Sequence, residues 1–166
     1  MKFDDFFAAM SVARVDYVLV GGLAVSLQGV VRGTLDVDVV LAMDAANLDR
    51  FIAAARAMGL APSLPVPIES LADAAQMDLW HRERNMLAFS LREAAPAGLV
   101  VDVLVRPRVS HADLRSKASV RSMGSIDIPV ASIEHLIALK SGTGRSIDAL
   151  DVEQLERLRN SRSAGA

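Results

Sequence analysis

The chain has 166 residues, with 18 Lys and Arg against 20 Asp and Glu, a formal net charge of −2 and no cysteine. This length fits one domain with its own hydrophobic core. The lack of cysteine excludes a disulfide scaffold, a thiolate nucleophile and a Cys-ligated metal, and the charge excludes a strongly basic nucleic-acid coat protein. No apolar run reaches the roughly 20 residues that span a bilayer, so we expect a cytoplasmic domain without membrane contact.

The first half of the chain alternates helical and extended patterns. In chain order, the spacing of apolar residues predicts a helix at Phe3–Ala13, a strand at Asp16–Val20, a helix at Leu23–Val30, a strand at Leu35–Leu41 and a helix at Ala45–Met58. Gly21-Gly22 separates the first strand from the next helix. Prolines between Pro62 and Pro67 predict a loop, which leads into a short helix at Ile68–Met77.

The second half adds a pair of strands and a helical C-terminal part. Strands are predicted at Met86–Leu91 and Leu99–Val105, and the turn Pro96-Ala97-Gly98 makes them antiparallel. The pattern ends with a helix at Ser110–Lys117, an extended segment at Ile126–Val130 and helices at Ser132–Lys140 and Ser146–Arg159. The fold class is therefore α/β (α+β), with a mixed, partly antiparallel sheet flanked by helices. We expect a core at 1–130, C-terminal helices packed on it at 131–160 and a flexible tail at 161–166.

Three carboxylates stand in strands, where aspartate is a poor strand former. Asp36 and Asp38 are two residues apart, so they point to one face while their apolar neighbours fill the other. Asp102 lies inside an otherwise apolar run, and neither strand contains Lys or Arg. A buried charge needs a partner, and a divalent cation would offset all three charges. Three hard oxygen ligands without Cys or a nearby His favour Mg²⁺ or Mn²⁺ over Zn²⁺.

Simpler interpretations stand beside this one. The aspartates could form ion pairs instead, with Arg32, Arg106 or Arg108 as the cation. Gly21-Gly22 could be an ordinary turn from strand to helix. Alternatively, glycines at this point let the backbone approach a ligand, and the helix start offers free N–H groups to a phosphate. That second reading would set a phosphate site beside the metal site.

The arrangement resembles the nucleotidyltransferase superfamily. The pattern of that family is an apolar strand, Gly-Gly or Gly-Ser, a helix, Asp-x-Asp and a third acidic residue on a later strand. Here these parts are Val18–Val20, Gly21-Gly22, Leu23–Val30, Asp36-Val37-Asp38 and Asp102. The run from Arg32 to Asp36, and the stretch with Lys140, Asp148 and Asp151, also resemble the abortive-infection, toxin–antitoxin branch.

The resemblance implies the fold of that superfamily and a magnesium-dependent transfer reaction. A nucleoside monophosphate would pass from a nucleoside triphosphate such as ATP to an acceptor hydroxyl on RNA, a protein or a small molecule. Asp36, Asp38 and Asp102 would be the catalytic residues and would hold two Mg²⁺ (or Mn²⁺) ions, with Asp102 on the acceptor side.

The same resemblance implies the phosphate contacts and the partners. Gly21 and Gly22 would cradle the phosphates, and Arg32 or Lys140 would neutralise the leaving pyrophosphate. An antitoxin partner is an expectation of the toxin–antitoxin branch. The alternatives are an inactive protein of this fold that binds nucleotide, RNA or a partner protein, and a drug-modifying nucleotidyltransferase.

The other polar residues have structural interpretations. Lys140 could cap its own helix as readily as contact a nucleotide. We expect Asp148 and Asp151 to interact with the dipole of the last helix. The segment from Trp80 to Asn85 favours a solvated edge over an acceptor groove. Surface or core positions are expected for the scattered histidines, which are His81, His111 and His135.

Overall fold

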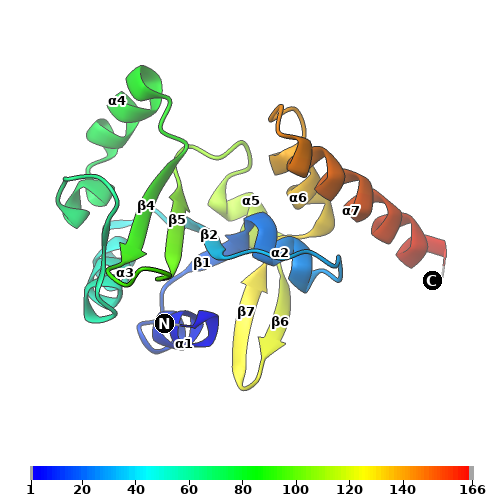
Figure 1. The fold of residues 1–166 in the computed structure, drawn as a ribbon, viewed down its shortest axis with the longest axis horizontal. Helices are drawn as coiled ribbons and strands as arrows, with labels where there is room; N and C mark the ends of the chain where they lie inside the picture. Colours follow the sequence, from blue (N-terminus) through cyan, green and yellow to red (C-terminus); the bar gives the residue numbers. More distant parts are fainter. Residues whose placement is uncertain (1, 165–166) are drawn as a thin grey trace.

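The structure is a computed structural model that describes residues 2–164. Its strands are β1 (Tyr17–Val20), β2 (Asp36–Leu41), β3 (Leu60–Pro62), β4 (Ala88–Glu93), β5 (Val100–Leu104), β6 (Ser119–Met123) and β7 (Ile126–Val130). Together they form one mixed sheet in the order β3-β4-β5-β2-β1-β7-β6 (Figure 1). Strands β1 and β7 are parallel, as are β2 and β5, and the other pairs are antiparallel. The sheet is therefore mixed and partly antiparallel, which confirms the predicted fold class.

Helices surround this sheet. They are α1 (Phe3–Val12), α2 (Gly21–Leu27), α3 (Ala45–Ala57), α4 (Ala74–Arg84), α5 (His111–Ser116), α6 (Ile133–Lys140) and α7 (Ser146–Ala164), with a 3₁₀ helix, η1, at Ile68–Ala72. Helix α3 begins where the Asp44 side chain accepts a hydrogen bond from the Asn47 N–H, and Ser132 caps α6 in the same way. In residues 2–164 no helix combines the length and apolar character that crossing a membrane requires.

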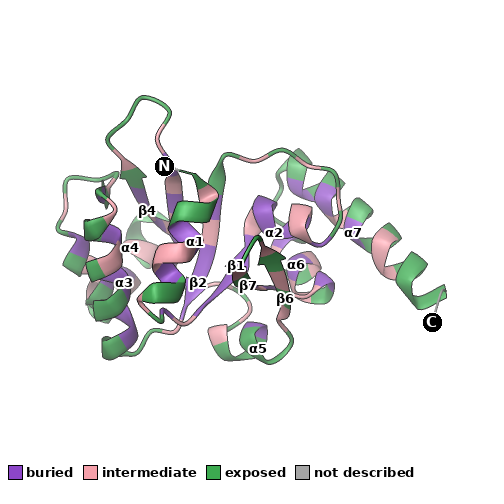
Figure 2. Ribbon diagram, turned by 90° about the horizontal axis from the view of Figure 1, so that it is seen from below, coloured by how far each residue is buried: buried purple, intermediate pink, exposed green. Residues whose placement is uncertain are grey.

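The core lies at the centre of the sheet. All four residues of β1 are buried, and Figure 2 shows the buried positions concentrated in β1, β2 and the helix faces turned toward them. Along β2, Val37, Val39 and Leu41 are buried on one face, so Asp36, Asp38 and Val40 emerge on the other. Helix α1 contributes Phe6, Phe7 and Met10 to the same core. The alternation of β2 thus places two carboxylates on the face opposite its main apolar contacts.

Two edge strands and several boundaries differ from the sequence prediction. Strands β3 and β6 are not predicted, because they are short edge strands with weak apolar alternation. Helix α2 begins at Gly21 rather than Leu23, so the Gly-Gly pair belongs to the helix itself. The helix expected at Ile68–Met77 is divided into η1 and the first turn of α4, which continues to Arg84.

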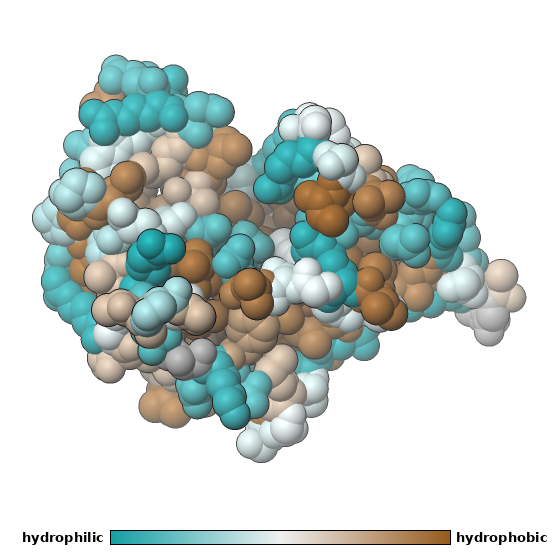
Figure 3. Space-filling model, in the orientation of Figure 1, coloured by the Kyte–Doolittle hydropathy of each residue, from teal (hydrophilic) through white to brown (hydrophobic). Residues whose placement is uncertain are grey.

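The C-terminal part forms a distinct end of the molecule. Helix α7 continues to Ala164, through the first part of the tail predicted at 161–166, and the Arg162 guanidinium donates a hydrogen bond to the Gln28 carbonyl. Residues 165 and 166 of that predicted tail lie outside the described residues. The space-filling view shows the surface indented between α4 and the pair α6–α7 (Figure 3). Helix α6 contacts α2, which joins this end to the central strands.

Candidate active site

Two of the three predicted carboxylates lie side by side. Strands β2 and β5 are parallel, and their register pairs Asp38 with Asp102. Neighbouring strands lie about 4.8 Å apart, so the two side chains emerge from adjacent positions on one face. Asp36 shares that face but lies at the exposed first position of β2. Within residues 2–164, no group of three His, Cys, Asp or Glu side chains is already gathered closely enough to hold a metal ion.

The carboxylate pair is electrostatically strained. Burial raises the pKa of the Asp38 carboxyl to about 6, and the negative charges of Asp102 and Asp36 act in the same direction. The positive charge of Lys140 and a hydrogen bond from the Gly22 N–H oppose this rise in pKa. Two adjacent carboxylates of this kind fit a hard divalent cation, because Mg²⁺ binds through one or two carboxylates and completes its shell with substrate phosphates and water.

A serine that the sequence analysis misses supports Asp102. The Ser90 hydroxyl donates a hydrogen bond to the Asp102 carboxylate, and the antiparallel register of β4 and β5 pairs the two residues directly. Ser90 occurs in an alternating strand with no local signal of a special role. Only the register between β4 and β5 identifies it.

The arginines proposed as simple partners of these aspartates bind elsewhere. Arg32 Nε lies 3.1 Å from Asp151 Oδ1, Arg106 pairs with Asp78, and Arg108 donates to the Ser141 carbonyl. In the described part of the chain, none of Asp36, Asp38 and Asp102 forms an ion pair with Lys, Arg or His. Among the described residues, no cation is therefore in direct contact with the pair to balance its negative charge.

Because Gly21 and Gly22 have no side chains, two charged side chains, Asp38 and Arg32, can lie against their backbone. Gly21 has φ +66°, and a Cβ added there would lie 1.8 Å from Asp38 Oδ2. A Cβ added at Gly22 would lie 1.5 Å from Arg32 Nη1. The backbone of this turn is thus approached from one side by a carboxylate and from the other by a guanidinium. That the turn also holds phosphates stays a prediction.

Arg32 is placed beside this turn with unused donors. Its side chain is 19% exposed, and its Nε and Nη1 atoms are buried without a hydrogen-bond partner, although Nε faces the Asp151 carboxylate. A buried donor without a partner costs free energy that an added acceptor recovers. Since the group is cationic, the acceptor that fits it best is an anion.

A buried ion-pair cluster adjoins the site at the start of α7. Lys140 Nζ lies 2.8 Å from Asp148 Oδ1 and 2.8 Å from Asp151 Oδ2, and all three side chains are at most 7% exposed. Burial alone would raise the pKa of Asp148, but hydrogen bonds from Lys140, Thr143 and Arg145 hold it below its usual range. The interpretation of Asp148 and Asp151 as helix-dipole partners is therefore incomplete, because both carboxylates are buried partners of Lys140.

The remaining predicted candidates lie apart from the carboxylates. His111 Nε2 is 3.4 Å from Asp16 Oδ1, His81 Nδ1 is 3.0 Å from the Met86 carbonyl, and His135 lies on α6. The segment from Trp80 to Asn85 forms the end of α4, with Trp80 packed against the core. None of these side chains contacts Asp38 or Asp102 among the described contacts.

Comparison with known proteins identifies the fold. No protein-family model matches the chain, and no curated protein matches it in sequence. Solved structures do match it over nearly its whole length, and they define the fold of this chain as that of the nucleotidyltransferases. The lincosamide antibiotic adenylyltransferase LnuA, solved with lincomycin bound, has a TM-score of 0.58 and 16% identity, over 95% of this chain and 98% of that one. ANT(2″)-Ia, in complex with adenylyl-2″-tobramycin, has a TM-score of 0.52 and 14% identity, over 98% and 96%.

Proposed function

We propose that this protein is a metal-dependent nucleotidyltransferase that transfers a nucleoside monophosphate from a nucleoside triphosphate to the hydroxyl of a small molecule. The observation that carries the proposal is the pairing of Asp38 with Asp102 on adjacent strands, beside the Gly21-Gly22 turn. The likeness of the fold to two antibiotic-modifying enzymes supports the same reaction class.

Asp36, Asp38 and Asp102 would hold Mg²⁺ or Mn²⁺. When bound, the cation supplies a positive charge that stabilises the attacking and leaving oxygens of an in-line displacement. The raised pKa of Asp38 supports this assignment, because a bound cation relieves the repulsion between the carboxylates. Asp36 would complete the set from its exposed position at the start of β2.

The chain's own residues would orient the reactants and handle charge and protons. The acceptor oxygen attacks the α-phosphorus, the bond to pyrophosphate breaks, and the hydroxyl proton passes to the Asp102 carboxylate and then to water. The hydrogen bond from Ser90 fixes the orientation of that carboxylate. Arg32 Nη1, which has no partner among the described residues, would bind the leaving pyrophosphate, and Lys140, held by its two aspartates, would add a positive potential.

The comparisons favour a small-molecule acceptor, because LnuA was solved with lincomycin bound and ANT(2″)-Ia with adenylyl-2″-tobramycin. An RNA or protein acceptor and an antitoxin partner have no support from the same comparisons. The carboxylate pair argues against the alternative of an inactive protein of this fold. Holding two carboxylates together has an electrostatic cost, and a protein that only binds a partner, without a cation, does not need the pair.

Transfer of label from the α-phosphate tests the proposal. Protein incubated with Mg²⁺ and α-radiolabelled ATP should pass the label to an acceptor, and γ-radiolabelled ATP should not label it. ATP with Mn²⁺ should raise the melting temperature, and the double variant Asp36→Asn with Asp38→Asn should lose both effects. Asp49→Asn, an exposed carboxylate on α3, serves as the control. An unchanged temperature shift in the double variant would place the nucleotide elsewhere.

A further inference from the structure

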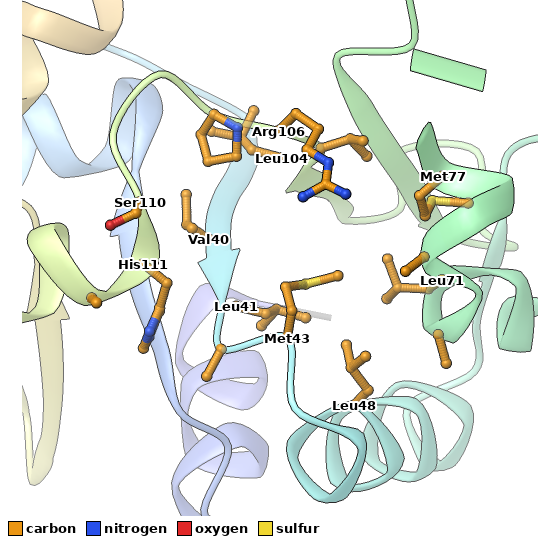
Figure 4. A pocket seen from close by; sticks show the side chains of 16 residues that line it. Val40, Leu41, Met43, Leu48, Leu71, Met77, Leu104, Arg106, Ser110 and His111 are labelled. Atoms are coloured by element: carbon orange, nitrogen blue, oxygen red, sulfur yellow. The ribbon is translucent and has the colours of Figure 1, made fainter. Parts of the chain in front are cut away.

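A cavity opens at the C-terminal ends of the two strands that carry Asp38 and Asp102. It has a volume of about 480 Å³ and lies between the C-terminal ends of β2 and β5, α4 and α5 (Figure 4). Figure 4 shows Met43, Leu71 and Met77 around the open space, with Leu41 and Leu48 at its lower end. A volume of this size is typical of sites for small organic ligands.

Two residues of the cavity lining lie one alternation step from the carboxylate pair along its strands. After Asp38, the next residue on that face of β2 is Val40, and after Asp102 the next on β5 is Leu104. Both Val40 and Leu104 line the cavity. Two residues of a strand span about 6.7 Å, so Val40 and Leu104 begin the apolar lining about that far along their strands from the two carboxylates. A ligand that extends from the cavity past Val40 and Leu104 would bring one atom toward the pair.

Two of the three polar side chains of the lining already have hydrogen-bond partners. Arg106 pairs with Asp78, and the Ser110 hydroxyl donates to Asp113 at 2.6 Å. His111 Nε2 lies 3.4 Å from Asp16 Oδ1 but makes no hydrogen bond among the described residues, so it can pair with one polar atom of a ligand. The rest of the lining is Val, Leu, Ala, Met and Pro. A nucleobase or a sugar placed here would bury several hydrogen-bonding groups and find few side-chain partners, which costs binding free energy.

We propose that this cavity holds the acceptor, and that the acceptor is an alcohol with an apolar body. This inference rests on the proposed nucleotidyl transfer and names its substrate class. The apolar body fills the space above Val40 and Leu104, and the hydroxyl points toward Asp38 and Asp102. The alcohol oxygen forms the new bond to the α-phosphorus as the bond to pyrophosphate breaks, and the proton leaves through Asp102. The products are a nucleotidyl ester of the alcohol and pyrophosphate.

A homologous series of alcohols tests this assignment directly. With α-radiolabelled ATP and Mg²⁺, n-hexanol, n-heptanol and n-octanol should accept label with a kcat/KM that rises about fourfold per added methylene, the factor expected for moving one CH₂ out of water. Glycerol carries the same reactive group without an apolar body and should accept almost none. Equal rates for glycerol and n-octanol, or transfer to RNA alone, would overturn the acceptor assignment.

Two variants of exposed lining residues change the cavity and leave the core intact. Met43→Gln makes the lining polar at a side chain that is 53% exposed, and Ala74→Trp fills the space from the start of α4. Each should lower n-octanol transfer about tenfold or more, while the rise in melting temperature with ATP and Mn²⁺ stays unchanged. Leu64→Gln is the matched control, since Leu64 is 49% exposed and lies outside the lining. Loss of the ATP effect in the two variants would assign the cavity to the nucleobase instead.

A binding measurement without catalysis separates this inference from the proposed function. The uncharged fluorophore N-phenyl-1-naphthylamine should brighten with the wild-type protein, be displaced by n-octanol and fail to bind Ala74→Trp. Equal binding to wild type and Ala74→Trp would overturn the inference. If wild type shows neither ATP stabilisation with Mn²⁺ nor transfer, the proposed function fails and the acceptor assignment fails with it. If ATP stabilisation is present and only the alcohol dependence is missing, the acceptor assignment alone fails.

Discussion

Gly21 lies so close to Asp38 that a Cβ at residue 21 would stand 1.8 Å from one carboxylate oxygen and 2.4 Å from its carbon. The first glycine of the pair therefore makes room for a catalytic candidate on the neighbouring strand. Its φ of +66° adds a second requirement, since residues with a Cβ rarely adopt that conformation. The contact with Asp38 and the positive φ therefore both require glycine at residue 21.

Gly21→Ala should therefore be strongly destabilising. We expect it to lower the free energy of unfolding by about 2–4 kcal/mol, because the added carbon forces Asp38 and the turn apart and strains the backbone. Urea denaturation followed by circular dichroism measures this change. Gly59→Ala, which has a positive φ of 73° but no atom near its Cβ, isolates the backbone contribution and should cost less. Equal costs in the two variants would contradict the role of the Asp38 contact.

Gly22→Ala should behave differently from Gly21→Ala. The atom that its Cβ would meet is the end of the flexible Arg32 side chain, and Gly22 has no positive φ. We expect a cost below about 1 kcal/mol in stability, with displacement of the guanidinium and a smaller rise in melting temperature on addition of ATP and Mn²⁺. Arg32→Ala should reproduce the loss of the ATP effect. A full ATP effect in both variants would show that Arg32 does not meet the nucleotide.

Asp38→Asn should stabilise the metal-free protein at neutral pH and not in acid. The pKa of Asp38 is raised from 3.8 to about 6, first by burial and then by Asp102, so the folded state holds the proton more tightly than the unfolded state. The stability that this group contributes is fully present below pH 4 and is lost as the pH rises through 6. At pH 7.5 the variant should therefore gain about 2 kcal/mol, and at pH 4 the gain should vanish. Urea unfolding at both pH values measures this gain in stability. A gain that does not depend on pH would show that it does not come from the ionisation of Asp38.

Lys140→Met should cost more than any surface substitution. It leaves Asp148 and Asp151 buried without the cation that lies 2.8 Å from each. Removing one partner of a buried ion pair typically costs about 3–5 kcal/mol. We expect the lower end of this range, because Arg145 and Arg32 still pair with Asp148 and Asp151. Lys117→Met, at an exposed position after α5, is the control and should change stability by less than about 0.5 kcal/mol. A Lys140→Met protein as stable as the control would mean that Arg145 and Arg32, which also pair with Asp148 and Asp151, balance the two carboxylates without Lys140.

Much of the fold follows from short-range patterns. Apolar alternation predicts β2 and β5, and the Pro96-Ala97-Gly98 turn predicts the antiparallel β4–β5 pair that the structure contains. Strand β6 is not predicted because its own sequence has little apolar alternation, and it forms by hydrogen bonding to its partner β7. An edge strand with mixed exposure carries little pattern of its own, so its existence depends on pairing.

The sequence by itself determined that Asp36 and Asp38 share a face, that glycines precede them and that Asp102 stands in an apolar strand, because these facts depend only on the period of a strand and on residue type. Only the tertiary structure decided that Asp102 lies across from Asp38, that Ser90 holds it and that Val40 and Leu104 line a cavity at the C-terminal ends of their strands. These contacts join segments far apart in the chain, and their register is fixed by the packing of the whole sheet rather than by any local preference.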